Sequence, residues 1–508
     1  MIVSLFGSSG HMGLPTLKKF LLIPEVKEVR VLLEHKEKRN KLVKKLAKKY
    51  PNKLTIYYGD IANKEDVEKV IVGSSYLFNL AGVIPPKSDK FPELSYRCNE
   101  LGTYNIVDVI EEHPEIKLID ITTVALYGHR NDKHPFERIG DPLIPSVFDV
   151  YAANKLRGEY RILESKIPYF AIIRQTAMIY LEMLMANMND GLMFHTSFND
   201  PLEWSTAEDS ARLMANILKE DIKGHLTYDN FWRKVFNLGD GERNRINGYD
   251  TIQGGFTLIG GSVEKFYHPY DNVTRNFHGG FYYDGDELDN LFHYQNDSID
   301  EYWGKVLKKY PYMSMAKIVP SSIIRKFAIT RLYKDCNAPA YWYKHNDIAR
   351  LTAFFGSKEA YEAQPQKWSD FKLWDYKAYR STSTYQGIDY GFDINKSDKD
   401  ITIEDLKNVA KKHGGKLITK EFKTGDVYTQ VEWENSDKER FMARPYTVLR
   451  GGHWMNPLYH SYTWDFDRLA KKDELIASYW YDSHAKNEDH CYYMNDKFEA
   501  LMEPIKND

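Results

Sequence analysis

The sequence predicts an α/β protein in which a doubly wound domain with a parallel sheet precedes additional α+β domains in the C-terminal part. Three observations support this prediction. Strand-like apolar runs alternate with helical patterns over the first 130 residues, a glycine-rich loop follows the first run, and aromatic residues become more frequent after about residue 260. Strands that alternate with helices are joined by right-handed crossovers, which give a parallel sheet with helices on both faces.

The strands and helices of the first domain are predicted from short apolar runs and the amphipathic patterns between them. Strands are expected at residues 2–6, 29–33, 54–58, 76–82 and 117–124, and helices at 14–22, 41–50, 64–71 and 101–112. A helix after Lys155, a strand at 170–176 and a last βα piece that ends near residue 241 continue the alternation. We therefore expect this domain to end near residue 270.

A chain of 508 residues is longer than a single core usually supports, so several domains are expected. We predict a dinucleotide-binding domain over 1–270, an aromatic-rich region that covers the substrate over 271–395, and a small α+β module over 396–508. A polar linker is expected at 381–400. The last module is predicted to open with an amphipathic helix that Gly414 and Gly415 end.

Charge and cysteine content exclude several classes of protein. The formal net charge of -3 gives no general field that would attract nucleic acid. Three cysteines far apart in the sequence (Cys98, Cys336 and Cys491) indicate neither a disulfide framework nor a thiolate metal site. No apolar stretch reaches the roughly 20 residues that span a bilayer. We expect a cytoplasmic protein without an export signal or a membrane anchor.

The loop after the first strand, LFGSSGHMG, has glycines at positions 7, 10 and 13. In such a GxxGxxG loop, Gly7 permits a tight turn, Gly10 admits a pyrophosphate against the backbone, and Gly13 lets the helix pack closely on the sheet. The free N–H groups of the helix N-terminus then face the phosphates. We predict a dinucleotide site here, which also includes Ser9, His11 and Met12.

An acidic residue, Glu34, ends the second expected strand, where a carboxylate can accept hydrogen bonds from both ribose hydroxyls of the adenosine. This position favours NAD. The residues that follow could accommodate a 2′-phosphate, so NADP stays open; they are His35, Lys36, Lys38 and Arg39.

Further residues at the ends of the next strands are predicted to contact the cofactor, because ligands of open α/β sheets bind at the carboxyl ends of the strands. They are Asp60 and Ile61 in YYGDIA, Leu80, Ala81 and Gly82 in the NLAG run, and Thr122 in ITTVALYG.

Three residues form the predicted reactive set. Tyr151 and Lys155 are four residues apart, so both side chains share one face of a helix. A free tyrosine has a pKa of about 10, and a nearby ammonium together with an oxidised nicotinamide would favour the phenolate. Thr123 is expected to hydrogen-bond the substrate oxygen, Tyr151 to exchange its proton, and Lys155 to hold the nicotinamide ribose and tune Tyr151.

The combination of these motifs resembles the extended short-chain dehydrogenase/reductase family, the group of NAD-dependent epimerases and dehydratases. The resemblance covers about the first 240 residues and includes RCNELGTYN with Asn99 and Thr103, the strand ending in Arg174, and WSTAEDSA with Asp209. It implies a Rossmann fold, a nicotinamide cofactor, a place for Asn99 in the cofactor site, a small-molecule substrate and a homodimer.

Departures from the family pattern indicate the branch. Dehydratases of this family have an Asp-Glu pair directly after the active Thr, whereas Val124 and Ala125 stand here. The sequence IIRQTAMIY lacks the Asn by which epimerases commonly hold the nucleotide phosphate. We therefore expect an oxidoreductase that acts on a secondary alcohol or ketone. An epimerase and a nicotinamide-sensing binding protein are the alternatives. The Met- and Leu-rich residues 180–194 are interpreted as core, with an apolar substrate pocket as the alternative.

The C-terminal module weakly resembles zinc-ribbon-like modules, but cysteines are missing near Asn435 and Met455, where those modules hold zinc. A histidine and aspartate cluster in the same region lacks the HxxxH or HExxH spacing that would place two ligands on one helix face. It consists of His453, His460, His484, His490, Asp482 and Asp489. We predict no metal.

Overall fold

A computed structural model describes residues 1–183, 190–454 and 463–494, except for the side chains of Lys38, Arg39, Ala316, Ala328 and Thr463. Within those ranges, each helix is too short or too polar to cross a bilayer.

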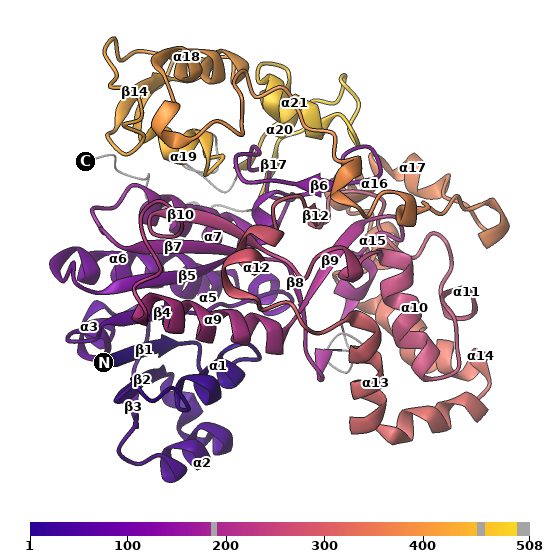
Figure 1. The fold of residues 1–508 in the computed structure, drawn as a ribbon. Coiled ribbons are helices and arrows are strands. Elements are labelled where there is room, and N and C mark those ends of the chain that lie inside the picture. The colour runs from indigo at the N-terminus through magenta and orange to yellow at the C-terminus, as the bar shows by residue number, and fades with distance from the viewer. Residues whose placement is uncertain (184–189, 455–462, 495–508) are drawn as a thin grey trace.

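The first domain contains a seven-stranded sheet in which every neighbouring pair of strands is parallel, in the order β10-β7-β5-β4-β1-β2-β3 (Figure 1). The strand order changes direction between β1 and β4, so the loop after β1 opens at a point where α/β sheets bind ligands. The strands are β1 (Ile2–Phe6), β2 (Glu28–Leu33), β3 (Leu54–Tyr58), β4 (Tyr76–Asn79), β5 (Lys117–Thr123), β7 (Phe170–Gln175) and β10 (Lys234–Leu238). The predicted doubly wound α/β class is confirmed.

Helices cover both faces of this sheet because successive strand residues point to opposite sides. Phe78, Ile119 and Ile173 pack in the core with α1, α9 and α12, whereas Leu77, Leu118 and Ile172 pack with α3, α6 and α7. The helices of the domain are α1 (Gly13–Phe20), α2 (Lys41–Lys49), α3 (Lys64–Ile71), α4 (Lys87–Lys90), α5 (Pro92–Ser95), α6 (Gly102–Glu112), α7 (Val150–Leu163), α9 (Ala207–Ile222) and α12 (Asp286–Phe292).

Most of the strands and helices lie where the sequence predicts them. The strand expected at 76–82 is shorter and ends at Asn79, because the side chain of Asn79 turns back to accept from the backbone N–H of Ala81. Leu80, Ala81 and Gly82 therefore belong to a loop at the carboxyl end of the sheet.

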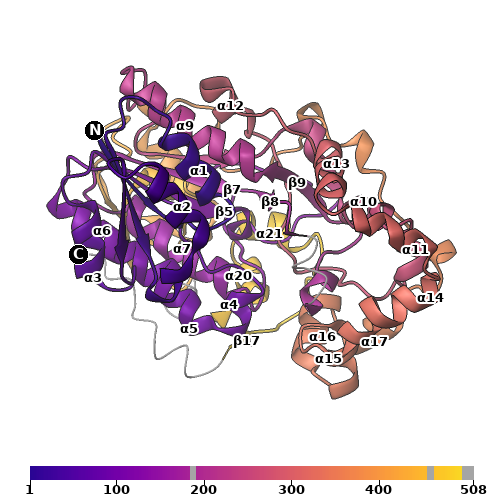
Figure 2. The same ribbon diagram turned by 90° about the horizontal axis from the view of Figure 1, so that it is seen from below.

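Two small sheets beside the main sheet join distant parts of the chain. One contains β8 (Ala177–Ile179), β9 (Pro201–Thr206) and β11 (Arg245–Asn247), and the other pairs β6 (Phe136–Glu137) with β12 (Phe281–Tyr282). Figure 2 shows the helices that follow them gathered on the side away from α2 and α3. These helices are α10 (Gly248–Leu258), α11 (Val263–Phe266), α13 (Ile299–Lys309), α14 (Ser321–Ile324), α15 (Pro339–His345), α16 (Ile348–Phe355) and α17 (Lys358–Glu362).

The segment 381–400, expected to be a polar linker, is anchored to the rest of the protein. The side chains of Tyr390 and Ile394 are buried, and the Tyr390 hydroxyl donates to Asp141 at 2.5 Å. Its buried anchors are isolated aromatic and aliphatic residues without a period, which explains why the sequence pattern shows only the polar residues between them.

The C-terminal module packs on the face of the sheet that α3, α6 and α7 cover (Figure 1). Trp433, Phe441 and Trp454 share one hydrophobic core with Ile162 and Leu163 of α7. The module contains α18 (Ile403–Lys412), β13 (Lys416–Leu417), β14 (Val431–Glu434), β15 (Arg440–Ala443), α19 (Pro445–Leu449), β16 (Thr463–Trp464), α20 (Phe466–Ala470), α21 (Glu474–Trp480) and β17 (Tyr492–Tyr493).

Candidate functional site

The glycine loop is packed so closely that side chains are excluded from two of its positions. Gly7 has a φ of +72°, and a Cβ there would lie 2.5 Å from the carbonyl oxygen of Leu80. A Cβ at position 13 would lie 2.0 Å from the carbonyl oxygen of Gly7. The loop therefore brings bare backbone to the N-terminus of α1, which is the arrangement that accommodates a pyrophosphate.

The other predicted residues of this loop differ in their surroundings. Ser9 is half-buried, whereas Gly10 and His11 are exposed. The His11 ring stacks on Tyr180, with 3.6 Å between the ring centres, and burial lowers the pKa of His11. Met12 is buried in the core with helix α1, so its side chain points away from the loop surface.

Acidic residues stand at the ends of β2 and β3 as predicted, and each has a basic partner. Glu34 is exposed and forms an ion pair with Lys36. Burial opposes ionisation of Asp60, but a 2.9 Å hydrogen bond from the backbone of Ala62 and a 2.7 Å bond from Arg97 lower its pKa. The side chains of Lys38 and Arg39 lie outside the described residues. Ile61, next to Asp60, packs close to Gly102 of α6.

Lys155 lies at the junction of two strand ends. Its ammonium donates to the backbone oxygens of Ala81 at 3.3 Å and Ile121 at 2.9 Å, and its side chain is buried. A Cβ at position 82 would lie 3.8 Å from the Lys155 Cε and 3.6 Å from the Asn99 amide oxygen. Lys155, Gly82 and Asn99, which are far apart in the sequence, are thus neighbours.

Asn99 fixes the loop after β4. It lies in a π-helical turn (Tyr96–Leu101), donates to the backbone oxygen of Val83 at 2.9 Å, and accepts from the Val83 N–H at 2.9 Å. A π-turn inside a helix is often found at functional sites. Here it holds the loop beside Lys155.

The Thr123 side chain lies beside Tyr151 and acts to lower its pKa, and the Thr123 hydroxyl accepts from the backbone of Ala125 at 3.2 Å. Burial raises the pKa of Tyr151, and this effect is larger than that of Thr123. From the sequence we expected Lys155 and an oxidised nicotinamide to favour the phenolate of Tyr151. The groups of the protein itself raise the pKa of Tyr151 instead. With its pKa raised, Tyr151 keeps its proton at neutral pH.

Thr122, which was predicted to contact the cofactor, directs its hydroxyl to a partner inside the protein. It donates to the Glu159 carboxylate at 2.8 Å. Glu159 also pairs with Arg174 at 2.5 Å and with Nε2 of His453 at 3.0 Å, and all of these side chains are buried. Burial alone would raise the pKa of Glu159, but the Arg174 guanidinium and His453 lower it to about 2.

Sequence reasoning missed Glu159, although its position carried a signal. Tyr151, Lys155 and Glu159 are spaced by four residues along α7, so they form one stripe that faces the sheet. No local sequence signal pointed to the partners from the C-terminal module. These partners are His453 and the backbone oxygen of Gly451, to which Arg174 donates at 2.5 Å.

A second missed group lies beside Tyr151. Asp149 caps α7 by accepting from the Ala152 N–H at 2.9 Å, and its other oxygen lies 3.1 Å from Nδ1 of His278. Burial and the charge of Asp149 raise the pKa of Asp89 to about 7. An Asp two residues before Tyr151 is a helix-start signal that the sequence shows, but nothing in it points to Asp89 or His278.

The histidine cluster of the C-terminal region is dispersed in the structure. His453 bonds Glu159, the His484 ring stacks on Trp480, and His460 lies outside the described residues. In the described parts of the chain, Asp467, Glu488 and His490 bring one potential ligand atom each within 4.8 Å of the others. Since Glu488 pairs with Arg275 and Asp467 accepts from Trp480, both carboxylates already have partners. The absence of metal stays a prediction.

The resemblance of the C-terminal module to a zinc ribbon also stays unconfirmed. The Asn435 side chain stabilises the turn that follows β14. Its amide oxygen accepts from the backbone N–H groups of Asp437 at 2.9 Å and Glu439 at 3.0 Å. Met455, the second position considered, lies outside the described residues.

The match to a known family model lies in the N-terminal part of the chain. Residues 4–167 match the 3-beta hydroxysteroid dehydrogenase/isomerase family. UDP-glucose 4-epimerases of Rickettsia rickettsii (strain Sheila Smith) and Rickettsia akari (strain Hartford) are 27% and 26% identical over 121 residues, which is 23% of this chain. The matched segment spans about a third (35%) of the length of these relatives. The predicted resemblance to extended short-chain dehydrogenases/reductases is thus confirmed for this part.

Two solved structures are similar to this chain over about three fifths of its length. A dTDP-glucose 4,6-dehydratase double mutant from Streptomyces venezuelae with NAD bound has a TM-score of 0.50 and 16% identity, and the match covers 61% of this chain and 97% of that one. A dTDP-glucose 4,6-dehydratase from Bacillus anthracis in complex with NAD has a TM-score of 0.48 and 18% identity, covering 62% and 98%. The similarity to the Streptomyces venezuelae structure shows that this chain has a Rossmann-type fold.

Proposed function

We propose that the protein is an NAD(P)-dependent oxidoreductase of the extended short-chain dehydrogenase type, which transfers hydride between a nicotinamide and a secondary alcohol or ketone. The observation that carries this proposal is the placement of Thr123 beside Tyr151, with Lys155 one helical turn further along α7 and bonded to Ala81 in the loop after β4 and to Ile121 of β5.

The residues of the chain suit a dinucleotide. The loop of Gly7, Gly10 and Gly13 offers a backbone cradle that a Cβ would fill, and the loop after β4 brings Ala81 and Gly82 beside Lys155. We propose that Gly7 to Gly13 hold the pyrophosphate, Glu34 the adenosine ribose, and Lys155 with Asn99 the nicotinamide half. The nicotinamide supplies or accepts the hydride when it is bound.

The proton chemistry falls to Tyr151. Because burial raises its pKa, Tyr151 holds a proton that it can give to the oxygen of a ketone as that oxygen gains negative charge. Thr123 binds the same oxygen through its hydroxyl. In the reverse direction the Lys155 ammonium stabilises the phenolate that receives the proton.

Cofactor choice depends on the end of β2. Glu34 favours NAD because a carboxylate accepts from the ribose hydroxyls and repels a 2′-phosphate. We therefore propose NAD as the cofactor. Lys36, which pairs with Glu34 in the structure, is the residue through which NADP would be accommodated.

The first substrate class to test is a small, largely apolar secondary alcohol or ketone. The family model that matches residues 4–167 supports this choice. We further propose a cytoplasmic homodimer that binds neither nucleic acid nor membranes. The net charge of -3 supports the part of this proposal that concerns nucleic acid.

An NAD-dependent sugar or sugar-nucleotide epimerase is the second candidate, because the curated relatives are UDP-glucose 4-epimerases. An epimerase returns the hydride to its substrate, so it holds its NAD tightly and produces no net reduced cofactor. An oxidoreductase changes the near-ultraviolet absorbance of the reduced nicotinamide in proportion to the substrate converted. Measuring both cofactor retention and absorbance separates the two.

The decisive experiment is the variant Tyr151→Phe. We expect turnover to fall by about 10²–10⁴-fold, as for loss of a positioned general acid, while NADH binding, measured by fluorescence titration, stays within about threefold. Tyr343→Phe is the matched control because its exposed hydroxyl bonds Glu362 far from the site along the chain. Undiminished turnover in Tyr151→Phe would refute the proposal.

A further inference from the structure

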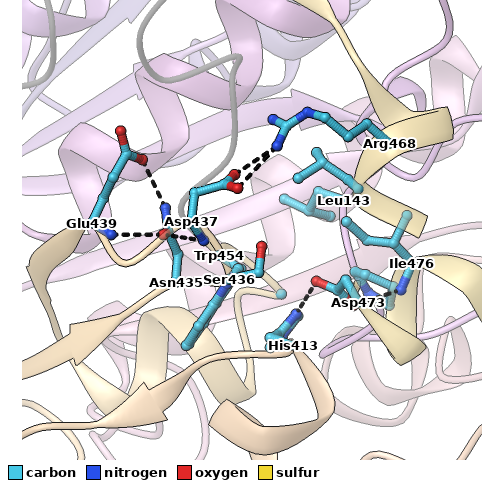
Figure 3. Close-up of a pocket in the computed structure, with 13 residues that line it drawn as sticks. Leu143, His413, Asn435, Ser436, Asp437, Glu439, Trp454, Arg468, Asp473 and Ile476 are labelled. Atoms are coloured by element: carbon cyan, nitrogen blue, oxygen red, sulfur yellow. Dashed lines mark hydrogen bonds and ion pairs between the residues drawn. The ribbon is translucent and has the colours of Figure 1, made fainter. Parts of the chain in front are cut away.

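A pocket of about 370 Å³ lies between the C-terminal module and the first domain, lined by residues other than the reactive set (Figure 3). Its volume is at the lower end of the roughly 300–1,000 Å³ typical of small-molecule sites. The pocket lies between the turn after β14, the end of α18, the start of α21 and the loop residues Pro142 and Leu143 of the first domain.

A buried histidine and aspartate form the polar base of this pocket. Nδ1 of His413 lies 2.7 Å from one oxygen of Asp473, and both side chains are 3% exposed. The other Asp473 oxygen accepts from the backbone N–H groups of Leu475 and Ile476 at 2.9 and 3.0 Å. Since the carboxylate accepts this hydrogen bond, Nδ1 is the nitrogen that carries the proton, and in this tautomer Nε2 is an acceptor.

Nε2 of His413 has no partner among the described residues, and His413 lines the pocket. Its orientation is fixed from both sides. The ring stacks on Trp454 with 4.4 Å between ring centres and 6° between planes. Behind it, the chain turns through Gly414 at a φ of +69°, where a Cβ would lie 2.1 Å from the Lys472 oxygen. The HGGK motif thus holds an imidazole acceptor toward the pocket.

The turn after β14 supplies the polar wall (Figure 3). Ser436 lies against Gly414, next to His413, and its hydroxyl has no partner among the described residues. The Asp437 carboxylate is held by Arg468 at 2.8 and 3.0 Å and by Lys472 at 2.6 Å. These groups are fixed by the protein before any ligand arrives.

The opposite wall is apolar, and the lining as a whole disfavours anions. Leu143, Leu469 and Ile476 are buried side chains that line the pocket. The charged lining residues are three carboxylates, Asp437, Glu439 and Asp473, against one guanidinium, Arg468. A ligand that fits has hydrogen-bond donors on one side, an apolar face on the other, and no negative charge.

We propose that this pocket binds a neutral monosaccharide or simple glycoside. The hydroxyl groups of a pyranose ring donate to Nε2 of His413 and to the carboxylates of the turn, and its C–H face packs on Leu143, Leu469 and Ile476. This binding site is separate from the proposed oxidoreductase site.

The test is ligand-observed saturation-transfer NMR on the full chain without nicotinamide, with methyl β-glucopyranoside and methyl β-galactopyranoside as neutral probes and glucose 6-phosphate as the anionic one. We expect at least one glycoside to bind, and glucose 6-phosphate to bind at least tenfold more weakly. Ser436→Trp, which fills the pocket, and His413→Phe, which keeps the stack on Trp454 but removes the acceptor, are each expected to weaken glycoside binding at least tenfold.

Ser369→Trp is the matched control, since Ser369 is exposed and lies outside the pocket. We expect the glycoside affinity of this variant to stay within twofold of that of the unsubstituted protein. Circular dichroism checks that each variant is folded. If Ser436→Trp does not fold, the result for His413→Phe tests the proposal. The proposal fails if neither glycoside binds, if binding survives both substitutions, or if the phosphate binds as well as the glycosides.

Discussion

In the C-terminal module, Nε2 of His453 lies 3.0 Å from the carboxylate of Glu159 on α7. Both side chains are fully buried. Glu159 is one helical turn beyond Lys155 and two turns beyond Tyr151, so this contact joins the last module to the helix that carries the proposed reactive residues. The module is therefore part of the support of that helix.

Replacing His453 is expected to destabilise the protein. His453→Leu removes one partner of a buried carboxylate, and a hydrogen bond to a charged group contributes about 1.5–3 kcal/mol. We expect the free energy of unfolding to fall by about 2 kcal/mol in urea denaturation. His225→Leu is the control, since His225 is exposed and its side chain bonds only Glu220 among the described residues. An unchanged stability in His453→Leu would show that the contact contributes nothing.

Replacing Lys155 is expected to weaken the cofactor site as well as turnover. Lys155→Met leaves the strand-end oxygens of Ala81 and Ile121 without their donor and removes the proposed contact to the nicotinamide ribose. We expect NADH affinity to fall at least tenfold in fluorescence titration, in contrast to Tyr151→Phe. Lys166→Met, at an exposed position just after α7, is the control. Equal affinities of Lys155→Met and the unsubstituted protein would place the nicotinamide elsewhere.

Replacing Glu34 is expected to change cofactor preference. Glu34→Ala removes the proposed acceptor for the ribose hydroxyls and frees Lys36 from its ion pair. Since about 1.4 kcal/mol corresponds to a factor of ten, loss of one such charged hydrogen bond lowers NAD affinity by about tenfold or more. NADP affinity is expected to rise. Isothermal titration with both cofactors measures the ratio, and Glu115→Ala, on the exposed segment before β5, is the control. A ratio that does not move would exclude Glu34 from the site.

Replacing Asp89 is expected to alter the pH dependence of stability. Burial, with the charges of Asp149 and Asp190, raises the pKa of Asp89 to about 7, while His278 acts in the opposite direction. The unfolded chain loses this proton at lower pH, so the native state loses stability as the pH rises from about 4 to 7.

Asp89→Asn has no such proton to lose. It is therefore expected to have a higher melting temperature than the unsubstituted protein at pH 8, but a similar one at pH 4, with exposed Asp132→Asn as the control. A difference between the proteins that is independent of pH would contradict this account.

The sequence by itself determined the parts of this protein that depend on contacts between neighbours in the chain. The alternation of apolar runs and amphipathic patterns predicted the parallel sheet, because strand and helix periods are local. The GxxGxxG loop predicted a tight backbone turn, because a glycine spacing records where side chains are excluded. The four-residue spacing of Tyr151 and Lys155 predicted one helix face for the same reason.

Tertiary structure alone decided how the parts that are distant in sequence meet. Glu159 and His453, separated by 294 residues, form a buried contact. Asp149 and His278 are paired beside Tyr151 across 129 residues. His413 acquires its role as a pocket acceptor only because Asp473 and Trp454 fold against it. Burial and long-range pairing set the protonation of such groups, and neither leaves a periodic pattern in the chain.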